Sequence, residues 1–229
     1  MKTCYIYFRK KIWQGLILKK LNNKYFTVIA DDCWGAEIYR KLGLEYKTPC
    51  VGLMIKAPCF LNLLENFDEK IMNKLKFVQK SKYPQLQHAS YPIGTLDGDI
   101  EIHFYHYSSE AEAERKWQSR VKRINKDNLF YKLDAEKTKQ EFPNDYVELI
   151  EKFNRLNGRK IILNSQPESV NEHSLWVDNW GIDGRLMFKK SLLFFDLAHW
   201  LNTGKLSNSF GNKIAYYLLL APRAKKGME

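Results

Sequence analysis

The chain has 229 residues, of which 45% are hydrophobic and 28% are charged, with a formal net charge of +11 at pH 7. This length and composition suffice for one main α/β domain with a substantial core, and they exclude a largely disordered chain. Apolar runs stay well short of the roughly 20 residues of a membrane-spanning helix, so we expect a chain that does not cross a bilayer by itself. The cysteines lack zinc-ribbon spacing, and we expect free thiols in a reducing cytoplasm. They are Cys4, Cys33, Cys50 and Cys59.

A basic arm, residues 1–24, precedes the first acidic residue, Asp31. We expect this arm to form a helix that packs on the domain, and the alternative is a helix that lies on an anionic membrane. Nucleic acid is not an expected partner, because no binding motif accompanies the charge. The apolar residues that share one helical face in this arm are Trp13, Leu16, Ile17 and Leu21.

The domain itself is predicted over residues 25–222, followed by a basic tail over 223–229. It opens with an apolar strand over 25–29, and strands then alternate with helical segments. This alternation predicts the α/β class, as a doubly wound, mainly parallel sheet with helices on both faces. The elements expected after the opening strand are a helix through about Leu42 that ends before Gly43, a strand over 48–55, a helix from Pro58 to about residue 80, a loop to 96, a strand over 99–107, a helix from the capping box at Ser109 through about Asn125, a helix over 146–153, strands over 159–164 and 174–177, and a helix over 195–202.

The polar turn after the first strand is a candidate site, because ligands bind at the carboxyl ends of strands in open α/β sheets. It contains Asp31, Asp32, Cys33, Trp34 and Gly35. A thiol at a helix N-terminus can act as a nucleophile, but the two adjacent carboxylates raise its pKa and favour a packed, inert cysteine. Asp32 is also suited to cap the following helix. We expect Asp32, Trp34 and Gly35 to line a pocket, with Cys33 as a minority catalytic candidate.

The strand predicted over 99–107 carries three ionisable groups on one face, Asp99, Glu101 and His103. We predict acid/base catalysis by His103 with Glu101 or Asp99, since imidazole titrates near neutrality. His106 is a candidate ligand-binding residue. A metal site is not expected, because a straight strand places His103 and His106 on opposite faces.

The acidic triplet Asp97-Gly98-Asp99 matches a short pattern with which many glycosyltransferases hold a divalent cation. A plain turn explains the same three residues, and we favour the turn.

A second polar cluster lies on and after the helix that contains Trp117. Guanidinium groups clamp phosphate or carboxylate in a bidentate way, and an internal ion-pair network is an equal alternative. The ligand-binding candidates in this cluster are Arg120, Arg123, Asn125, Asp127 and Asn128.

Several blocks of residues, in a fixed order and spacing, match a bacterial family. They are Asp32-Cys33-Trp34-Gly35 with 42–44 and 48–49, Tyr91-Pro92-Ile93-Gly94 with 99–104 and 106–107, residues 117–125 with 127–130, and 195–196 with 200–202. In these blocks the chain resembles domain-of-unknown-function family 1919, often labelled as exopolysaccharide biosynthesis proteins. The family pattern has Asn at the place of Asp32 and Gly at the place of Ala36, so a tight phosphate cradle in the turn is less secure.

The resemblance implies an α/β fold and a place among genes for capsule or extracellular polysaccharide synthesis, with no established reaction. We therefore expect a transferase that acts on a sugar or nucleotide-linked sugar, located in the cytoplasm or peripherally on the inner face of the cell membrane. Arg120 and Arg123 would bind phosphate. One alternative is acyl transfer to a polysaccharide through Cys33 or His103, and another is a non-catalytic component of polysaccharide assembly at a lipid surface. The sequence specifies no cofactor.

Overall fold

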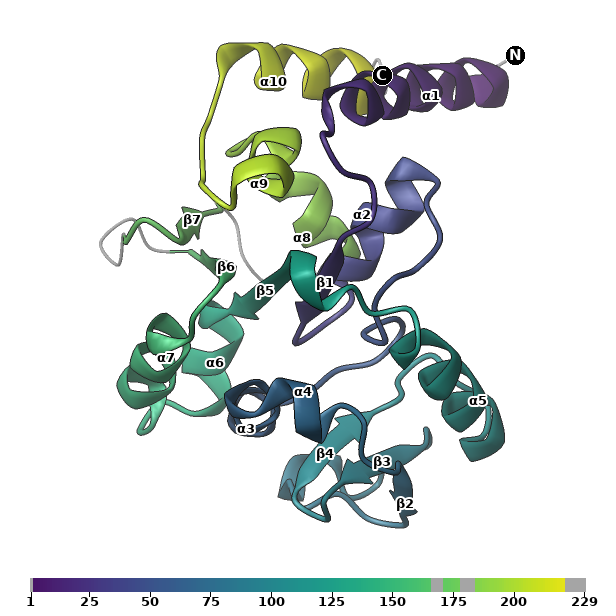
Figure 1. Ribbon diagram of the computed structural model, residues 1–229, viewed down its shortest axis with the longest axis vertical. Helices are drawn as coiled ribbons and strands as arrows, with labels where there is room; N and C mark the ends of the chain where they lie inside the picture. Colours follow the sequence, from purple (N-terminus) through teal and green to yellow (C-terminus); the bar gives the residue numbers. More distant parts are fainter. Residues whose placement is uncertain (1, 166–170, 178–183, 221–229) are drawn as a thin grey trace, which may run out of the picture.

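The computed structural model describes residues 2–165, 171–177 and 184–220, and of residues 2–5 only the backbone (Figure 1). The described chain is a mixed α/β structure that contains a four-stranded parallel sheet and a three-stranded antiparallel sheet. The predicted α/β class is confirmed. The basic tail over 223–229 lies outside the described residues.

The parallel sheet has the strand order β1-β5-β6-β7. Thr27 pairs with Leu129, and Phe130 pairs with Arg159. The order follows the chain in one direction, without the reversal that defines a doubly wound sheet, so that part of the prediction is not confirmed. The strands are β1 (Thr27–Ala30), β5 (Leu129–Asp134), β6 (Arg159–Asn164) and β7 (Ser174–Trp176). Three of them match predicted strands, whereas β5, in the interior of the sheet, was not predicted.

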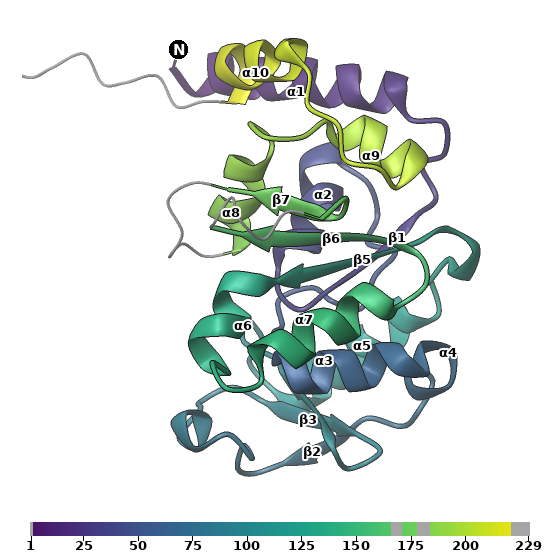
Figure 2. The same cartoon turned by 90° about the vertical axis from the view of Figure 1, so that its left-hand side faces the viewer.

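Helices cover both faces of the parallel sheet (Figure 2). Neighbouring residues of one strand point to opposite faces, so Val28 joins one core and Ile29 joins the other. The core around Val28 packs against α2 (Trp34–Leu42), α8 (Gly184–Ser191) and α9 (Leu197–Thr203). The core around Ile29 packs against α3 (Ala57–Glu65), α6 (Ala135–Glu141) and α7 (Tyr146–Arg155). Gly43 ends α2 in the left-handed conformation, with φ 65°, as predicted.

The basic arm forms one long helix, α1 (Lys2–Lys20), that lies over α2 and α9. Trp13, Ile17 and Leu21 are buried against the domain, whereas Leu16, predicted on the same face, is 48% exposed. Two C-terminal elements, α10 (Phe210–Ala215) and η3 (Tyr216–Leu220), lie beside α1 in both views. None of the helices that the structure describes has the length and apolar character that crossing a bilayer requires.

The antiparallel sheet lies at the other end of the molecule and has the order β2-β3-β4. Asp97, Gly98 and Asp99 connect β3 to β4, and the φ values of Asp97 and Gly98, 54° and 83°, lie in the left-handed region that favours turns. Asn73 donates hydrogen bonds of 2.7 Å to the Asp97 carboxylate. The acidic triplet is therefore a hairpin turn. The elements around it are α4 (Phe67–Lys70), β2 (Lys76–Val78), η1 (Pro84–Leu86), β3 (Ile93–Leu96), β4 (Ile100–His103), α5 (Glu110–Val121) and η2 (Lys126–Asn128).

Two predicted elements in this half are wrong. The helix expected from Pro58 to about residue 80 stops at Glu65, because Asn66 adopts φ −133°, and residues 76–78 then pair as β2 with β3. The strand expected over 48–55 is irregular apart from one bridge between Met54 and His103. β3 itself lies in a segment that was expected to be a loop.

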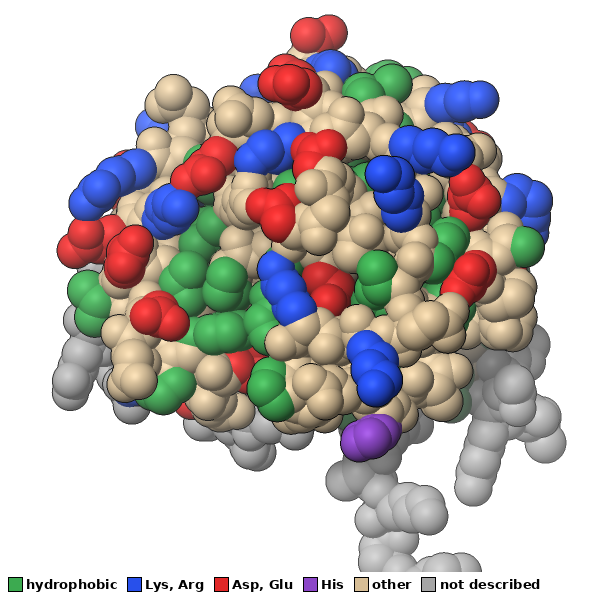
Figure 3. All heavy atoms as spheres, turned by 90° about the horizontal axis from the view of Figure 1, so that it is seen from below, with side chains coloured by type: hydrophobic (Ala, Val, Ile, Leu, Met, Phe, Trp, Pro, Cys, Tyr) green, Lys and Arg blue, Asp and Glu red, His purple; other side chains and the backbone are tan. Residues whose placement is uncertain are grey.

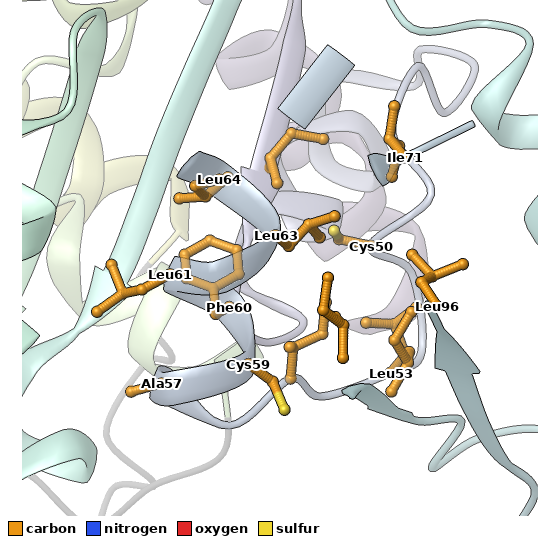
Figure 4. Close-up of a cluster of buried hydrophobic side chains, with 14 of the residues drawn as sticks. Cys50, Leu53, Ala57, Cys59, Phe60, Leu61, Leu63, Leu64, Ile71 and Leu96 are labelled. Atoms are coloured by element: carbon orange, nitrogen blue, oxygen red, sulfur yellow. The ribbon is translucent and has the colours of Figure 1, made fainter. Parts of the chain in front are cut away.

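The segment that precedes α3 joins the two sheets. Ile55 donates its N–H to the Asp31 carbonyl at 2.9 Å, and Met54 exchanges two 2.9 Å backbone hydrogen bonds with His103. The end of β1 and the end of β4 thus lie on either side of a single extended segment. Beneath it, Cys50 and Leu53 pack into the hydrophobic cluster of α3 (Figure 4).

Candidate functional site

Four charged side chains meet at the carboxyl ends of β1 and β5. The ammonium Nζ of Lys132 lies 2.9 Å from Asp31 Oδ1 and 2.8 Å from Asp32 Oδ2. The other oxygen of Asp31 accepts the backbone N–H of Asp134 at 3.0 Å. Lys132 is completely buried, Asp31 and Asp134 are also buried, and Asp32 is partly exposed. We call these four residues the carboxyl-edge cluster.

The three carboxyl groups of the cluster have different pKa values, because burial and the neighbouring charges act on each of them differently. Burial raises the pKa of Asp31, and Lys132 only partly opposes this. Burial acts on Asp32 as well, but Lys132 and the Trp34 N–H hold the pKa of Asp32 below its ordinary value. Burial together with the charges of Asp31 and Asp32 raises the pKa of Asp134 to about 7, against the opposing charge of Lys132. The cluster therefore contains a carboxyl group that can take up or release a proton near neutral pH.

A second acid/base pair lies across the extended segment, on β4. His103 is completely buried, and its Nε2 lies 2.8 Å from Glu101 Oε1, although neither ring nitrogen has a well-aligned hydrogen bond. Glu101 also accepts hydrogen bonds from Ser81 Oγ at 2.5 Å and from the Lys82 N–H at 2.8 Å. Burial lowers the pKa of His103, Lys56 adds to this, and Glu101 opposes it. The structure thus brings together two of the three predicted acid/base residues.

Lys137, in the first turn of α6, occupies the space between the two groups. Its ammonium lies 2.9 Å from the Met54 sulfur, a weak acceptor, and its positive charge acts on the pKa values of Asp31, Asp32 and His103. Among the described residues, no carboxylate forms an ion pair with this ammonium. Three helices, α2, α3 and α6, begin at this edge, where Asp32 and Asp134 cap α2 and α6 and no side chain caps α3, whose N-terminus favours an anion. The edge can therefore bind an anionic group beside an acid/base pair.

The predicted residues of the first turn separate into two kinds. Cys33 and Asp32 reach the surface of the cluster, and burial with the Asp32 charge raises the pKa of the Cys33 thiol, which disfavours a thiolate. Asp32 Oδ1 accepts the Trp34 N–H at 2.8 Å, so it serves as the expected helix cap. Trp34 is completely buried against the aromatic rings of Phe188, Phe195 and Trp200, away from any ligand.

Gly35 allows α2 to pack closely on β1. A Cβ atom at Gly35 would lie 3.0 Å from Val28 Cγ1 and 3.1 Å from Ala30 Cβ. Its backbone is helical, and the close neighbours are apolar side chains. The structure gives this glycine a packing role in place of a phosphate cradle.

Two other predicted residues lie apart from the buried pair. Asp99 is exposed beside the hairpin turn, where it accepts a hydrogen bond from Asn62 at 2.7 Å. His106 is exposed after the end of β4, and its backbone N–H donates to the Gly52 carbonyl. The described residues contain no group of three or more His, Cys, Asp or Glu side chains suited to hold a metal ion.

Arg120, in the last turn of α5, and Arg123, just after this helix, have different partners. Arg120 is 9% exposed, donates to the Tyr107 hydroxyl and lies 3.4 Å from the Val51 carbonyl. Arg123 pairs with Glu45 at 2.7 Å on the surface. The three predicted residues contact successive parts of the extended segment 51–54: Arg120 contacts Val51, Cys33 contacts Leu53 and His103 contacts Met54. Arg123 thus forms an ion pair, with Glu45 as its partner, whereas Arg120 contacts a hydroxyl and a carbonyl oxygen.

The polar residues after α5 lie at the opposite edge of the parallel sheet. Asn125 and Asn128 donate to the Tyr25 carbonyl at 2.7 and 3.1 Å, which anchors the approach to β5. With Asp127 and Arg159 they line a hollow of about 460 Å³ at the amino-terminal ends of the strands. These three candidates are therefore separated from the carboxyl-edge cluster by the length of the strands.

Lys132, Asp134 and Lys137 were not among the predicted site residues. Lys132 interrupts an apolar run, Leu129–Leu133, and a charged residue inside such a run indicates a buried partner. Because β5 was not predicted as a strand, the sequence analysis could not place Lys132 beside Asp31 and Asp32.

A family model described as a domain of unknown function, DUF1919, matches residues 5–202. Among curated proteins, an uncharacterized protein of Haemophilus influenzae (strain ATCC 51907 / DSM 11121 / KW20 / Rd) is 44% identical over 112 residues, which cover 49% of this chain and 50% of that protein. The chain thus matches about half the length of this relative. The family description contains no exopolysaccharide label, so the resemblance is confirmed for the family alone. By the match over residues 5–202, the chain belongs to the DUF1919 family.

Proposed function

We propose that the chain is an enzyme whose active site is the carboxyl edge of the parallel sheet, and that it transfers a group from a nucleotide-linked sugar. The observation that carries this proposal is Lys137, a half-buried ammonium without a carboxylate partner among the described residues, placed between two acid/base groups. A diphosphate is a suitable occupant, because it accepts hydrogen bonds from the Lys137 ammonium and from N–H groups at the start of α3, whose cap residue Lys56 makes no side-chain hydrogen bond to the helix.

In this proposal the residues divide the chemistry between binding and proton transfer. Lys137 holds the phosphate, and the partly exposed Asp32 is the carboxylate that meets the acceptor hydroxyl. Asp134, with its pKa raised to about 7 by burial and by its acidic neighbours, receives or returns a proton within the cluster. Glu101 orients the His103 ring from the other side. The sugar and the polysaccharide context come from the family resemblance, and the location at the inner face of the membrane is part of the same proposal.

Binding of donor molecules tests the proposal directly. We expect isothermal titration calorimetry to detect a nucleoside-diphosphate sugar, with or without Mn²⁺, and Lys137→Met to weaken that binding at least about tenfold, since a charged hydrogen bond contributes about 1.5–3 kcal/mol. The matched control is Lys122→Met, at the exposed end of α5, which should leave binding unchanged.

The alternatives give different results in the same titrations. Binding of coenzyme A with sensitivity to Cys33→Ser would favour acyl transfer over sugar transfer. A chain that binds no nucleoside-diphosphate sugar and no coenzyme A would contradict an enzymatic role, and it would favour a non-catalytic component of polysaccharide assembly. Equal binding by the natural chain and by Lys137→Met would refute the assignment of the site.

A further inference from the structure

Most of the large apolar side chains that are exposed in the described chain lie at one end of the molecule. Fifteen large hydrophobic residues are exposed in the described chain, and nine of them lie on α1, α10 and η3. Phe210 is 78% exposed, and Phe8 and Tyr217 are each 63% exposed. The nine residues are Ile6, Tyr7, Phe8, Ile12, Leu16, Phe210, Ile214, Tyr217 and Leu218. We call them the apolar layer, and such a concentration marks an interaction surface.

The spacing of these residues gives each helix a second apolar side. Phe8, Ile12 and Leu16 recur every four residues along α1. They lie on a different side of the helix from Trp13 and Ile17, which are buried. On the C-terminal elements, Phe210 and Ile214 are four residues apart, and Leu218 follows at the same interval. A surface helix that only packed on its domain would expose polar residues at these positions.

The two helical segments form one continuous surface. α1 contacts η3, and Arg9 Nη2 donates to the Tyr217 carbonyl at 3.3 Å. Both views place α1 and α10 side by side at the top of the molecule, at the end opposite the antiparallel sheet (Figures 1 and 2). The apolar layer therefore covers one end of the chain.

The helices at this end are basic, although Lys20 at the end of α1 lies 3.9 Å from Asp196, the cap of α9. The elements α1, α8, α9, α10 and η3 contain ten Lys and Arg residues and no Asp or Glu. Burial lowers the pKa of Lys189, and the nearby charges of Lys10 and Arg9 lower it further. At the opposite end, acidic and basic side chains are interspersed (Figure 3).

We propose that the apolar layer docks on the surface of a membrane that contains anionic lipids. Aromatic and aliphatic side chains enter the boundary between headgroups and acyl chains, while the surrounding lysines contact lipid phosphates. A second copy of the chain is a poorer occupant, because two such ends would bring the basic α1 helices together, each with six Lys or Arg residues and no Asp or Glu. This inference does not depend on the proposed enzymatic activity.

Vesicle sedimentation with the full chain tests the docking. We expect the protein to sediment with vesicles that mix phosphatidylglycerol and phosphatidylcholine, to bind vesicles of phosphatidylcholine alone much more weakly, and to be released by high salt. The variant Phe8→Ser/Phe210→Ser should lower the partition coefficient at least about tenfold, from the apolar area withdrawn from the bilayer. The matched control, Met72→Ser/Tyr105→Ser, replaces two side chains that are exposed elsewhere, and its partition should be unchanged.

Thermal unfolding of both double variants verifies that each is folded. Absence of binding to the anionic vesicles, or equal binding by the two double variants, would overturn the proposal. Light scattering tests whether a second copy of the chain occupies the apolar layer. A natural chain that is dimeric and becomes monomeric in Phe8→Ser/Phe210→Ser, without vesicle binding, would identify the apolar layer as a self-association surface and would also overturn it.

Discussion

Replacement of Lys132 by Met is the strongest perturbation of the carboxyl-edge cluster. The side chain is completely buried, and its ammonium lies within 3 Å of oxygens of both Asp31 and Asp32. Methionine has a similar length and no charge, so it fills the space but leaves the carboxylates without a counter-charge. Removal of one partner from a buried ion pair costs about 3–5 kcal/mol. We expect Lys132→Met to lose a free energy of unfolding of this size at neutral pH.

The loss should depend on pH, and its sign follows from the carboxylates. Without Lys132, burial raises the pKa of Asp31 further above the value near 4 of an unfolded chain, and it raises the pKa of Asp32, which Lys132 otherwise holds below that value. A group whose pKa is higher in the folded state contributes its full stability below the unfolded pKa and loses it as pH rises through the folded pKa. The deficit of Lys132→Met relative to the natural chain should therefore widen between about pH 5 and pH 8.

Urea unfolding followed by tryptophan fluorescence measures this deficit, because Trp34 and Trp200 are completely buried. The matched control is Lys126→Met, which removes an exposed ion pair with Asp68 at 2.9 Å and should change the free energy of unfolding by less than about 1 kcal/mol. A Lys132→Met variant as stable as this control, or a deficit that is constant with pH, would refute the charge assignment in the cluster.

Two further measurements examine other parts of the fold. Burial lowers the pKa of His103, so the unfolded chain takes up this proton first as pH falls below about 6.5. The stability advantage of the natural chain over His103→Gln should shrink from pH 7 to pH 5 in urea unfolding, and an advantage that grows would contradict the buried neutral imidazole. Gly35→Val should destabilise the chain by about 1–3 kcal/mol in thermal melts, because its side chain would collide with Val28. Gly15→Ala, with open space around it, should be neutral or stabilising, and equal losses would refute the packing argument.

Local patterns predicted the first unit of the fold well. The strand before Asp31, the polar turn, the helix and its end at Gly43 each depend on interactions within a few residues. The helix expected beyond Glu65 failed for a different reason, because residues 76–78 pair with a strand that is distant in sequence. β5 was missed because its apolar run contains Lys132, and only the carboxylates of another strand make that lysine compatible with burial.

The candidate site was predictable to the same limited extent. Alternation along the strand brought Glu101 and His103 together correctly, but the other partners of Glu101, Ser81 Oγ and the Lys82 N–H, come from a loop about twenty residues earlier. Arg120 and Arg123 were assigned to phosphate because a sequence does not reveal that Tyr107 and Glu45 already face them. Polar residues at the two ends of one set of strands look alike in sequence, so the sequence did not show that Asn125 and Asn128 line a hollow far from the carboxyl-edge cluster.

The composition of the carboxyl-edge cluster is itself an argument for function. Buried ion pairs seldom add net stability, and apolar side chains of similar volume would serve a core at least as well. Here three carboxyl groups surround one ammonium, so the fully ionised cluster has an excess of negative charge, which a bound proton reduces. Asp134 is the group whose raised pKa accommodates that proton near neutrality, while its side chain also caps α6 through the Lys137 N–H. The turn at Asp134 therefore positions the proton-holding carboxyl group and begins α6, the helix that carries Lys137. In the proposed function, these four residues link acid/base chemistry to anion binding.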